Sequence, residues 1–535
     1  MNTDLLTFPY ASRRIPLLAG NGVVATSHPL AAQAGLTMLQ AGGTAVDAAI
    51  ATAAALTVLE PTSNGIGGDA FALVWDGTQL HGLNGSGRAP AGLTVEAVHQ
   101  AGHVQIPPAG WFSVTVPGAP AAWHDLHARF GTLPFAQLFE PAITYAEEGH
   151  PVAPVVARNW ALGVAYARQL DGPMYAGFLP TFAPDGTAPA AGSRFVSPGH
   201  ARTLRRIATS GARDFYAGEI AQALVDFAQR TAGLLTLDDL AGHTSTWVNP
   251  ISMRYHDHEV WEIPPNGQGV AALMALGMLE GLDVARYPRD SAGSYHLQIE
   301  AMKLAFADAY RYIADPEHAD VPISGLLDSD YLARRGAQIG STARSAEPGQ
   351  PPRGGTVYLC AADRNGQMVS MIQSNFWGFG SGIVVPEWGI ALHNRGYGFT
   401  LDPKHPNLLK PGKRPYHTII PAFLTCQGRP VGPFGVMGGE MQPQGHTQVV
   451  INTLDYGLNP QATLDAPRWR VANDIVYVEL ETPRHIIEGL EARGHTVRVL
   501  AEPGSFGRGQ IIWQLPSGAY AAGSEPRCDG CAVGW

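Results

Sequence analysis

Charged residues are scarce in this chain of 535 residues, where Lys, Arg, Asp and Glu make up 15% and hydrophobic residues 45%. So little charge beside so much apolar content is typical of a compact folded protein and argues against disorder. The net charge of −10, with no local cluster of Lys and Arg, gives nucleic acid no electrostatic reason to bind. We therefore expect no nucleic-acid partner. The length indicates two to four domains or two closely joined halves.

Long apolar runs are missing as well. The most apolar stretch, Ala48–Leu59, is well short of the ~20 residues that span a bilayer. The first ten residues contain no basic region followed by an apolar stretch, so we expect neither a secretory signal nor a membrane partner. Of the four cysteines only Cys528 and Cys531 are close together, which indicates neither a zinc site nor a disulfide framework. These features predict a cytoplasmic protein.

Capping residues and periodicity predict several helices. Ser27 is placed to cap a helix that starts at Pro29, and a glycine pair after Gln40 would end it. Closely spaced alanines predict a tightly packed helix over Ala45–Leu59, and a third helix is expected over residues 294–314. The glycine-rich turn at 63–69 leads into a strand and not a helix, so it indicates close backbone packing more than a phosphate loop.

The composition of the chain changes after residue 338. From Ile339 to Gly355 the sequence is polar, rich in Pro and Gly and without periodicity, which predicts an exposed linker. Two short apolar runs follow at once, Thr356–Ala362 and Met368–Gln373, joined through Asn365-Gly366. Asn-Gly between two such runs is a strong hairpin signal. The predicted order is linker, Gly-Gly, Thr, hairpin.

That order suits an N-terminal nucleophile. If the chain is cut between Gly355 and Thr356, the new α-amine of Thr356 lies beside its own hydroxyl. The pKa of an α-amine is near ~7.7–8, so it can take the hydroxyl proton at neutral pH. Gly355 has no Cβ and would let the scissile peptide adopt a strained geometry. The residues alone leave open a plainer interpretation, in which Thr356 only starts an edge strand.

Many short blocks, in the right order along nearly the whole chain, resemble the γ-glutamyltransferase (γ-glutamyl transpeptidase) family. They include His28-Pro29-Leu30-Ala31, Gly67-Gly68-Asp69-Ala70-Phe71, Phe379-Gly380-Ser381-Gly382 and Pro411-Gly412-Lys413-Arg414-Pro415. The resemblance implies an α+β fold, the four-layer αββα sandwich of the N-terminal-nucleophile hydrolases. It also implies self-cleavage into a large subunit, residues 1–355, and a small subunit, residues 356–535, and acyl transfer through a Thr ester.

Carried over from the family, the catalytic residues fall on four positions. The nucleophile falls on Thr356, and the hydroxyl that supports it on Ser374, where the family usually has Thr. The two backbone N–H groups of the oxyanion hole fall on Gly438 and Gly439, for which an ordinary turn is the alternative interpretation. No metal-ligand spacing, phosphate loop or dinucleotide fingerprint is present, so we expect no cofactor and no metal.

The substrate pocket departs from the family pattern. The Asn that helps to hold the glutamyl amine falls on Phe376, and the later carboxylate falls on Gly398, with Arg395 at a neighbouring polar position. The paired serines that bind the α-carboxylate become His417-Thr418. The large-subunit arginine is best matched by Arg88, two residues off register. An ammonium group would meet no carboxylate here, whereas an anion would meet positive charge.

We therefore expect an amidohydrolase whose substrate is a small anionic amide, with the oxamate type as one candidate, bound by Arg88, Arg395, His417, Thr418 and Phe376. The alternatives are a true γ-glutamyl hydrolase or transferase and a family member without catalysis. Arg395 can also be a solvated loop residue and His417 a core histidine, while His393 and His446 are interpreted as structural and Cys360 as a small buried hydrophobe. The expected partners are the substrate and the two subunits of one precursor, with a higher oligomer left open.

Overall fold

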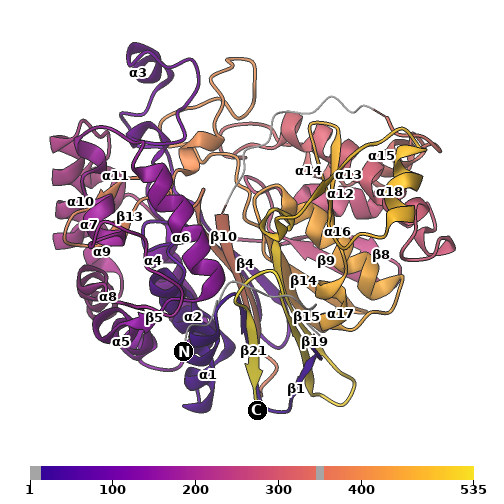
Figure 1. The fold of residues 1–535 in the computed structure, drawn as a ribbon, viewed down its shortest axis with the longest axis horizontal. Coiled ribbons are helices and arrows are strands. Elements are labelled where there is room, and N and C mark those ends of the chain that lie inside the picture. The colour runs from indigo at the N-terminus through magenta and orange to yellow at the C-terminus, as the bar shows by residue number, and fades with distance from the viewer. Residues whose placement is uncertain (1–13, 345–354) are drawn as a thin grey trace.

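Two seven-stranded sheets form the centre of the molecule, with helices on both outer sides (Figure 1). The computed structural model describes residues 14–344 and 355–535. The first sheet has the spatial order β21 (Cys531–Gly534), β2 (Val23–Thr26), β10 (Gly355–Ala362), β11 (Met368–Phe376), β3 (Asp69–Trp75), β4 (Leu80–Gly85) and β7 (Thr246–Val248). The second has the order β1 (Leu17–Ala19), β20 (Tyr520–Ser524), β19 (Arg508–Gln514), β15 (Arg429–Met437), β14 (Ala422–Cys426), β9 (His258–Glu262) and β8 (Ile251–Tyr255).

The alternation of side chains along each strand produces the layers. In β3, Phe71 and Leu73 belong to the apolar core between the two sheets, whereas Ala72 and Val74 pack toward the helices of the first sheet. In β14, Phe423 faces the first sheet, and its neighbours pack into the core of the other outer layer. Strands that are apolar on both faces are buried on both faces, as a four-layer arrangement requires. The predicted αββα sandwich is confirmed.

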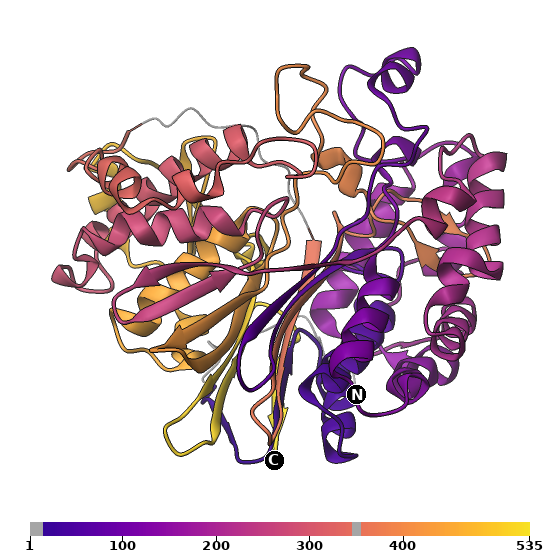
Figure 2. The ribbon, with the colours of Figure 1, turned by 180° about the vertical axis from the view of Figure 1, so that it is seen from behind.

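The helical layers differ in composition (Figure 2). The layer on the first sheet contains α1 (Pro29–Gln40), α2 (Ala45–Leu59), α4 (Ala119–Phe130), α5 (Glu140–Glu148), α6 (Pro154–Ala167), α8 (Pro198–Ser210) and α10 (Glu219–Arg230). The layer on the second contains α12 (Gly269–Glu280), α13 (Ala292–Tyr312), α16 (Met441–Leu454), α17 (Pro460–Asp465) and α18 (Arg484–Glu491). Within the described ranges, no helix has both the length and the apolar character needed to cross a membrane.

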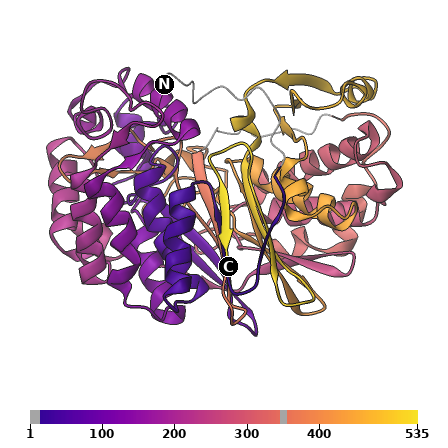
Figure 3. The ribbon, with the colours of Figure 1, turned by 60° about the horizontal axis from the view of Figure 1, so that its bottom comes forward.

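Smaller elements complete the fold, in which the indigo and magenta helices lie on one side of the central strands and the pink and orange helices on the other (Figure 3). The short helices are α3 (Val95–Gln100), α7 (Phe178–Phe182), α9 (Arg213–Ala217), α11 (Leu237–Ala241), α14 (Ile323–Leu326) and α15 (Ser329–Gly336). The remaining strands are β5 (His150–Pro151) with β6 (Arg194–Phe195), β12 (Val384–Val385) with β13 (Ile390–Ala391), and β16 (Trp469–Ala472), β17 (Ile475–Glu479) and β18 (Thr496–Leu500) in a three-stranded sheet.

The prediction that Ser27 caps α1 is wrong. The cap is His28, whose Nδ1 accepts a hydrogen bond from the Leu30 N–H at 3.2 Å. Ser27 Oγ instead donates to the Glu60 carboxylate at 2.5 Å, because the chain before α1 runs beside the end of α2. The expected close packing of the glycine turn is confirmed, since a Cβ on Gly68 would lie 2.6 Å from the Ser374 carbonyl oxygen.

The two expected subunits share both sheets. β10 and β11, which follow the predicted cleavage site, pair with β2 and β3 from the first part of the chain. In the other sheet, β14 pairs with β9 and β20 pairs with β1. A cut after Gly355 would therefore leave two chains held together by shared strands and a common core. Most of the predicted linker, residues 345–354, lies outside the described residues.

Buried neutral histidines predict a loss of stability in mild acid. Burial lowers the pKa of His28 to about 3 and that of His200 to about 4, whereas an unfolded histidine has a pKa of ~6.5. Below pH ~6.5 the unfolded chain therefore binds protons that the folded chain does not, and the free energy of unfolding falls by about 1.4 kcal/mol per pH unit for each histidine. We expect the Tm to fall from pH 7.5 to pH 5.

The variant His28→Asn provides a matched control, since Asn keeps an N-cap acceptor but does not titrate. Its Tm, measured by circular dichroism, should depend less steeply on pH than that of the wild type. A wild-type Tm that is level between pH 7.5 and pH 5 would contradict the argument.

Candidate active site

The hairpin of β10 and β11 brings Thr356 and Ser374 together at the centre of the molecule. Thr356 is the second residue of β10, and its Oγ1 lies 3.0 Å from Ser374 Oγ. Ser374 Oγ also accepts a hydrogen bond from the Phe376 N–H at 2.8 Å. Both hydroxyl residues are fully buried. A threonine hydroxyl held in this way has a fixed direction and a neighbour that can stabilise its charge.

Gly438 and Gly439 connect β15 to α16. Their φ angles are +135° and +63°, which side chains with a Cβ rarely adopt. Neither amide N–H donates a hydrogen bond to another residue in the described part of the chain. Both precede the N-terminus of a 14-residue helix, where the dipole favours negative charge. Two free N–H groups at such a place can stabilise an oxyanion.

Gln268 links this glycine pair to the expected substrate pocket. Its Nε2 donates to the Gly439 carbonyl oxygen at 2.8 Å and to the Thr418 carbonyl oxygen at 2.7 Å. The Ile420 N–H donates to Gln442 Oε1 at 2.9 Å, which ties the same segment to α16. The segment around Thr418 and the glycine pair are therefore held in one rigid unit.

A cavity of about 590 Å³ opens beside these groups. Its wall includes Phe376 and Thr418, both assigned to the pocket from the sequence, and Glu440, which follows Gly439. Burial raises the pKa of Glu440 well above its usual value, because it disfavours the charged form of the carboxyl. Other residues of the wall are Tyr310, Tyr397, Gly398, Asn407 and Tyr416. The cavity is large enough for a ligand bigger than a few atoms.

Arg395 lies buried behind Phe376. Its guanidinium carbon is 4.1 Å from the centre of the Phe376 ring, and Nη1 donates to Thr418 Oγ1 at 2.8 Å. Nε and Nη2 are buried and have no hydrogen-bond partner among the described residues. Burial lowers the pKa of Arg395 to about 9, which keeps it charged at neutral pH. The interpretation as a solvated loop arginine is wrong, because the side chain is 0% exposed.

A buried carboxylate that the sequence did not single out, Asp69, balances this charge. Asp69 Oδ2 lies 3.0 Å from His417 Nε2 and 3.5 Å from His393 Nδ1, and Oδ1 accepts from the Gly87 N–H. Burial works to raise the pKa of Asp69, but the two histidines and Arg395 outweigh it and hold the pKa well below its usual value. The feature of the sequence that could have identified Asp69 is its position directly after Gly67-Gly68.

His417 differs from Arg395 in both its charge and its hydrogen bonds. Burial, aided by Arg395, lowers the pKa of His417 to about 3, so the ring is neutral at pH 7. Nε2 faces Asp69, and Nδ1 accepts from the Ile419 N–H at 3.4 Å. The ring also packs on Phe71. Both ring nitrogens are engaged within the protein, which corresponds to the core-histidine alternative.

Arg88 belongs to another group of charges. Its Nη2 lies 2.8 Å from Glu317 Oε2, and Nη1 donates to the Gly412 carbonyl oxygen at 3.2 Å. Arg88 is not part of the cavity wall. A substrate contact would require the pair with Glu317 to open, so the geometry gives the predicted role of Arg88 no support.

The residues interpreted as structural are buried. His446 Nδ1 lies 2.6 Å from Glu262 Oε1, and His393 Nε2 donates to the Thr115 carbonyl oxygen at 2.9 Å. Cys360 is 0% exposed within β10, as expected of a small hydrophobe. All four cysteines are free thiols.

Three groups of potential metal ligands occur in the described ranges. They are Asp257 with His258 and Cys426, His296 with Glu300 and His495, and Asp315 with Glu317 and His318. In the second group Lys303 Nζ lies 3.0 Å from Glu300 Oε1, and in the third Arg88 pairs with Glu317. A cation of the protein thus already meets the carboxylates of both groups. None of the nine ligand residues borders the cavity.

We therefore expect amide hydrolysis to persist after treatment with EDTA and dialysis, because the proposed base is an amine and no ligand group borders the cavity. The measurement is the hydrolysis rate before and after chelation. Loss of activity that Zn²⁺ or Mg²⁺ restores would contradict this expectation and point to one of the three groups.

Comparison with known proteins identifies the family. The sequence profile of gamma-glutamyltranspeptidase matches residues 31–535. The chain belongs to the gamma-glutamyltranspeptidase family. It is 36% identical over 522 residues to the glutathione hydrolase-like YwrD proenzyme of Bacillus subtilis, covering 96% of this chain and 98% of the relative. It is 34% identical over 532 residues to the oxamate amidohydrolase proenzyme of Klebsiella pneumoniae, covering 96% and 98%.

Solved structures agree with this membership of the gamma-glutamyltranspeptidase family. A crystal structure of cephalosporin acylase from Bacillus halodurans is 54% identical, with a TM-score of 0.97, and the match covers 100% of this chain and 99% of that chain. The predictions of the family, of the α+β fold and of a self-processing amidohydrolase are confirmed. The nucleophile, the oxyanion donors and the substrate-binding residues stay predictions.

Proposed function

We propose that this family member cuts itself after Gly355 and then hydrolyses the amide bond of an anionic substrate through Thr356. In the first reaction Thr356 Oγ attacks the Gly355 carbonyl, the peptide C–N bond breaks, and water hydrolyses the resulting ester. The products are a large chain that ends at Gly355 and a small chain that begins at Thr356. The proenzyme relatives support this order of events.

Hydrolysis of a substrate would use the same hydroxyl. The α-amine of Thr356 takes the hydroxyl proton as Oγ attacks the amide carbonyl, and the N–H groups of Gly438 and Gly439 stabilise the oxyanion. When the C–N bond breaks, the ammonium group returns the proton to the leaving amine. Water, activated by the amine, then hydrolyses the Thr ester. The 3.0 Å contact between Thr356 and Ser374 supports the orientation of the hydroxyl.

The proposal that the substrate is an anion rests on the guanidinium of Arg395. It is a buried cation with two nitrogens that have no partner, next to a cavity wall formed by Phe376 and Thr418. Unpaired buried donors cost free energy, and a substrate carboxylate would satisfy them. The Phe376 ring covers the guanidinium, so we propose that this ring moves when the substrate binds.

The size of the cavity favours a second candidate substrate, a larger amide such as an acylated cephalosporin, over an amide as small as oxamate. An oxamate-type amide would fill a small part of 590 Å³, and pockets of several hundred Å³ usually bind drug-sized ligands. The likeness to a cephalosporin acylase points the same way. Both candidate substrates would acylate Thr356 in the same way. The oxamate-type amide and the larger amide differ in the length of the acyl group and the size of the leaving amine.

A substrate panel on the matured enzyme decides between these candidates. It compares oxamate, a γ-glutamyl amide, a cephalosporin with a carboxylate at the end of its acyl chain, and the same cephalosporin with a methyl ester there. We expect an amide with a free acyl carboxylate and no ammonium group to have the highest kcat/KM, and the ester to lose roughly ten- to a hundredfold. Preference for the γ-glutamyl amide would overturn the proposal.

A further inference from the structure

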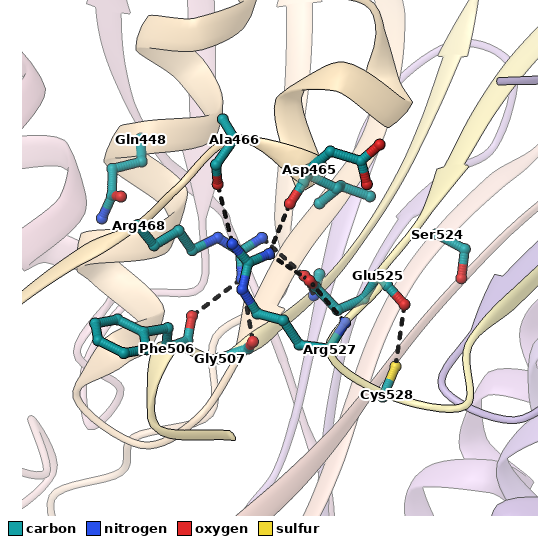
Figure 4. A network of polar contacts seen from close by, with 12 residues as sticks. Gln448, Asp465, Ala466, Arg468, Phe506, Gly507, Ser524, Glu525, Arg527 and Cys528 are labelled. Carbon is teal, nitrogen blue, oxygen red and sulfur yellow. Dashed lines mark hydrogen bonds and ion pairs between the residues drawn. The ribbon is translucent and has the colours of Figure 1, made fainter. Parts of the chain in front are cut away.

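A buried cluster of charges surrounds Arg468, Glu525 and Arg527 (Figure 4), and none of the three borders the substrate cavity. Arg468 Nη2 donates to Glu525 Oε2 at 2.8 Å, and Arg527 Nη1 donates to Glu525 Oε1 at 2.6 Å. Arg527 also bonds the carboxylate of Glu479. All four side chains are at most 9% exposed. Burying so many charges is costly unless each is paired, so the cluster is rigid once it forms.

Arg468 uses its remaining hydrogen bonds on a single stretch of backbone. Nη1 donates to the carbonyl oxygens of Phe506 and Gly507 at 3.0 and 3.1 Å. Glu525 Oε2 accepts a hydrogen bond from the N–H of Gly509, two residues after Gly507, at 2.7 Å. On the other side, Arg508 Nη1 pairs with Glu60 Oε1 at 2.8 Å. Residues 506–509 are therefore held from two directions.

Residues 506–509 pack directly against the backbone at Gly438. A Cβ on Gly438 would lie 3.1 Å from Gly507 Cα, and a Cβ on Gly507 would lie 2.6 Å from the Met437 carbonyl oxygen. Gly507 itself has a φ of +75°. Met437 pairs with Arg508 at the end of the ladder between β15 and β19, and Gly438 and Gly507 are the next residues beyond these two strand ends. The direction of the Gly438 N–H thus depends on where the backbone of Gly507 lies.

We infer that Arg468 is a positioning residue for the oxyanion hole, acting through Phe506 and Gly507 on Gly438. Oxyanion donors are effective because the protein fixes their direction before the reaction. The φ of +135° at Gly438 is an uncommon conformation that its surroundings must impose. Arg468 is not part of the cavity wall, and its hydrogen bonds go to Phe506, Gly507 and Glu525 and not to Thr356. The inference rests on the proposed role of Gly438.

The test compares Arg468→Lys with Arg335→Lys. Lys keeps the charge opposite Glu525 but has no planar group to bond both carbonyls and the carboxylate together. Arg335 is the matched control, since it also bonds a carboxylate, that of Asp308 at 3.0 Å, and a backbone carbonyl, that of Leu304 at 3.0 Å. It lies on α15, outside the cavity wall. Rates are divided by the number of active sites found by titration.

We expect Arg468→Lys to lower kcat roughly tenfold or more at an unchanged KM, below the 10²–10³-fold effect of removing a donor outright. The affinity for a boronic acid, whose tetrahedral adduct places an oxygen in the hole, should fall by the same factor. The affinity for the product carboxylate should not change. Arg335→Lys should keep the kcat and the boronic acid affinity of the wild type.

A wild-type kcat per active site in Arg468→Lys overturns the inference, as does an equal loss of affinity for the boronic acid and the product. If Arg468→Lys does not mature, Glu525→Gln replaces it, because this change loosens Arg468 without removing it, and the same criteria apply. A wild type that hydrolyses no amide would contradict the proposed function. An active wild type with an unimpaired variant would contradict the positioning role alone.

Discussion

Thr356→Ala is expected to remain one uncut chain and to lose amide hydrolysis by at least ~10³-fold. The substitution removes the hydroxyl that attacks the Gly355 carbonyl and, later, the substrate. It deletes a contact with Ser374 but adds no volume to the fully buried site, so the fold should persist. Denaturing gel electrophoresis measures the cut, and the release of amine measures hydrolysis.

Thr356→Ser is the matched control for this change. It retains a hydroxyl and, after cleavage, an α-amine, so it should still cut and turn over, at a lower rate because the serine side chain is less restricted at χ1. A Thr356→Ala protein that separates into two chains with the wild-type pattern would contradict the assignment of the nucleophile.

Replacing Arg395 should discriminate between substrates. Arg395→Met is expected to lower kcat/KM roughly ten- to a hundredfold for an amide with a free acyl carboxylate, because one or two charge-assisted hydrogen bonds of ~1.5–3 kcal/mol are lost. The methyl ester of the same amide should lose much less. The side chain lies outside the hairpin that carries Thr356, so maturation should proceed. Steady-state kinetics on the acid and ester pair measures the effect.

Two controls accompany this experiment. Without the Arg395 cation, less positive charge stabilises the buried Asp69 carboxylate, and the fold could lose stability. The Tm of the variant is therefore measured, and rates are compared per active site. Arg88→Met, which breaks the pair with Glu317 outside the cavity wall, should leave both substrates nearly unaffected. Equal losses on acid and ester in Arg395→Met would contradict the carboxylate contact, and a selective loss in Arg88→Met would restore Arg88 to the site.

Much of the fold could be predicted because its signals are local. The helix expected over Ala45–Leu59 is α2, with a capping box formed by Thr44 and Asp47. The hairpin at Asn365-Gly366 is β10 and β11, and the third expected helix is α13, displaced by two residues. Periodicity and turn chemistry act within a few residues. The error at Ser27 arose from a partner, Glu60, that the sequence places far away.

The site was harder to predict because its charges are arranged by tertiary contacts. Motif positions located Thr356 and Ser374 as neighbours, and Phe376 and Thr418 on one cavity wall. The pairing of Arg88 with Glu317 and the burial of Arg395 behind Phe376 join segments that no local pattern connects. His417 was expected to attract anions, but burial makes its ring neutral. A residue type indicates a charge only when its environment is known.

Intact-mass analysis of the purified wild-type protein, before and after reaction with an acylating substrate analogue, tests the central claim most directly. The account predicts a small chain with the mass of residues 356–535, Thr at its N-terminus, and one acyl group on that threonine. A protein that stays a single chain after long incubation, or an acyl group on another residue, would contradict it.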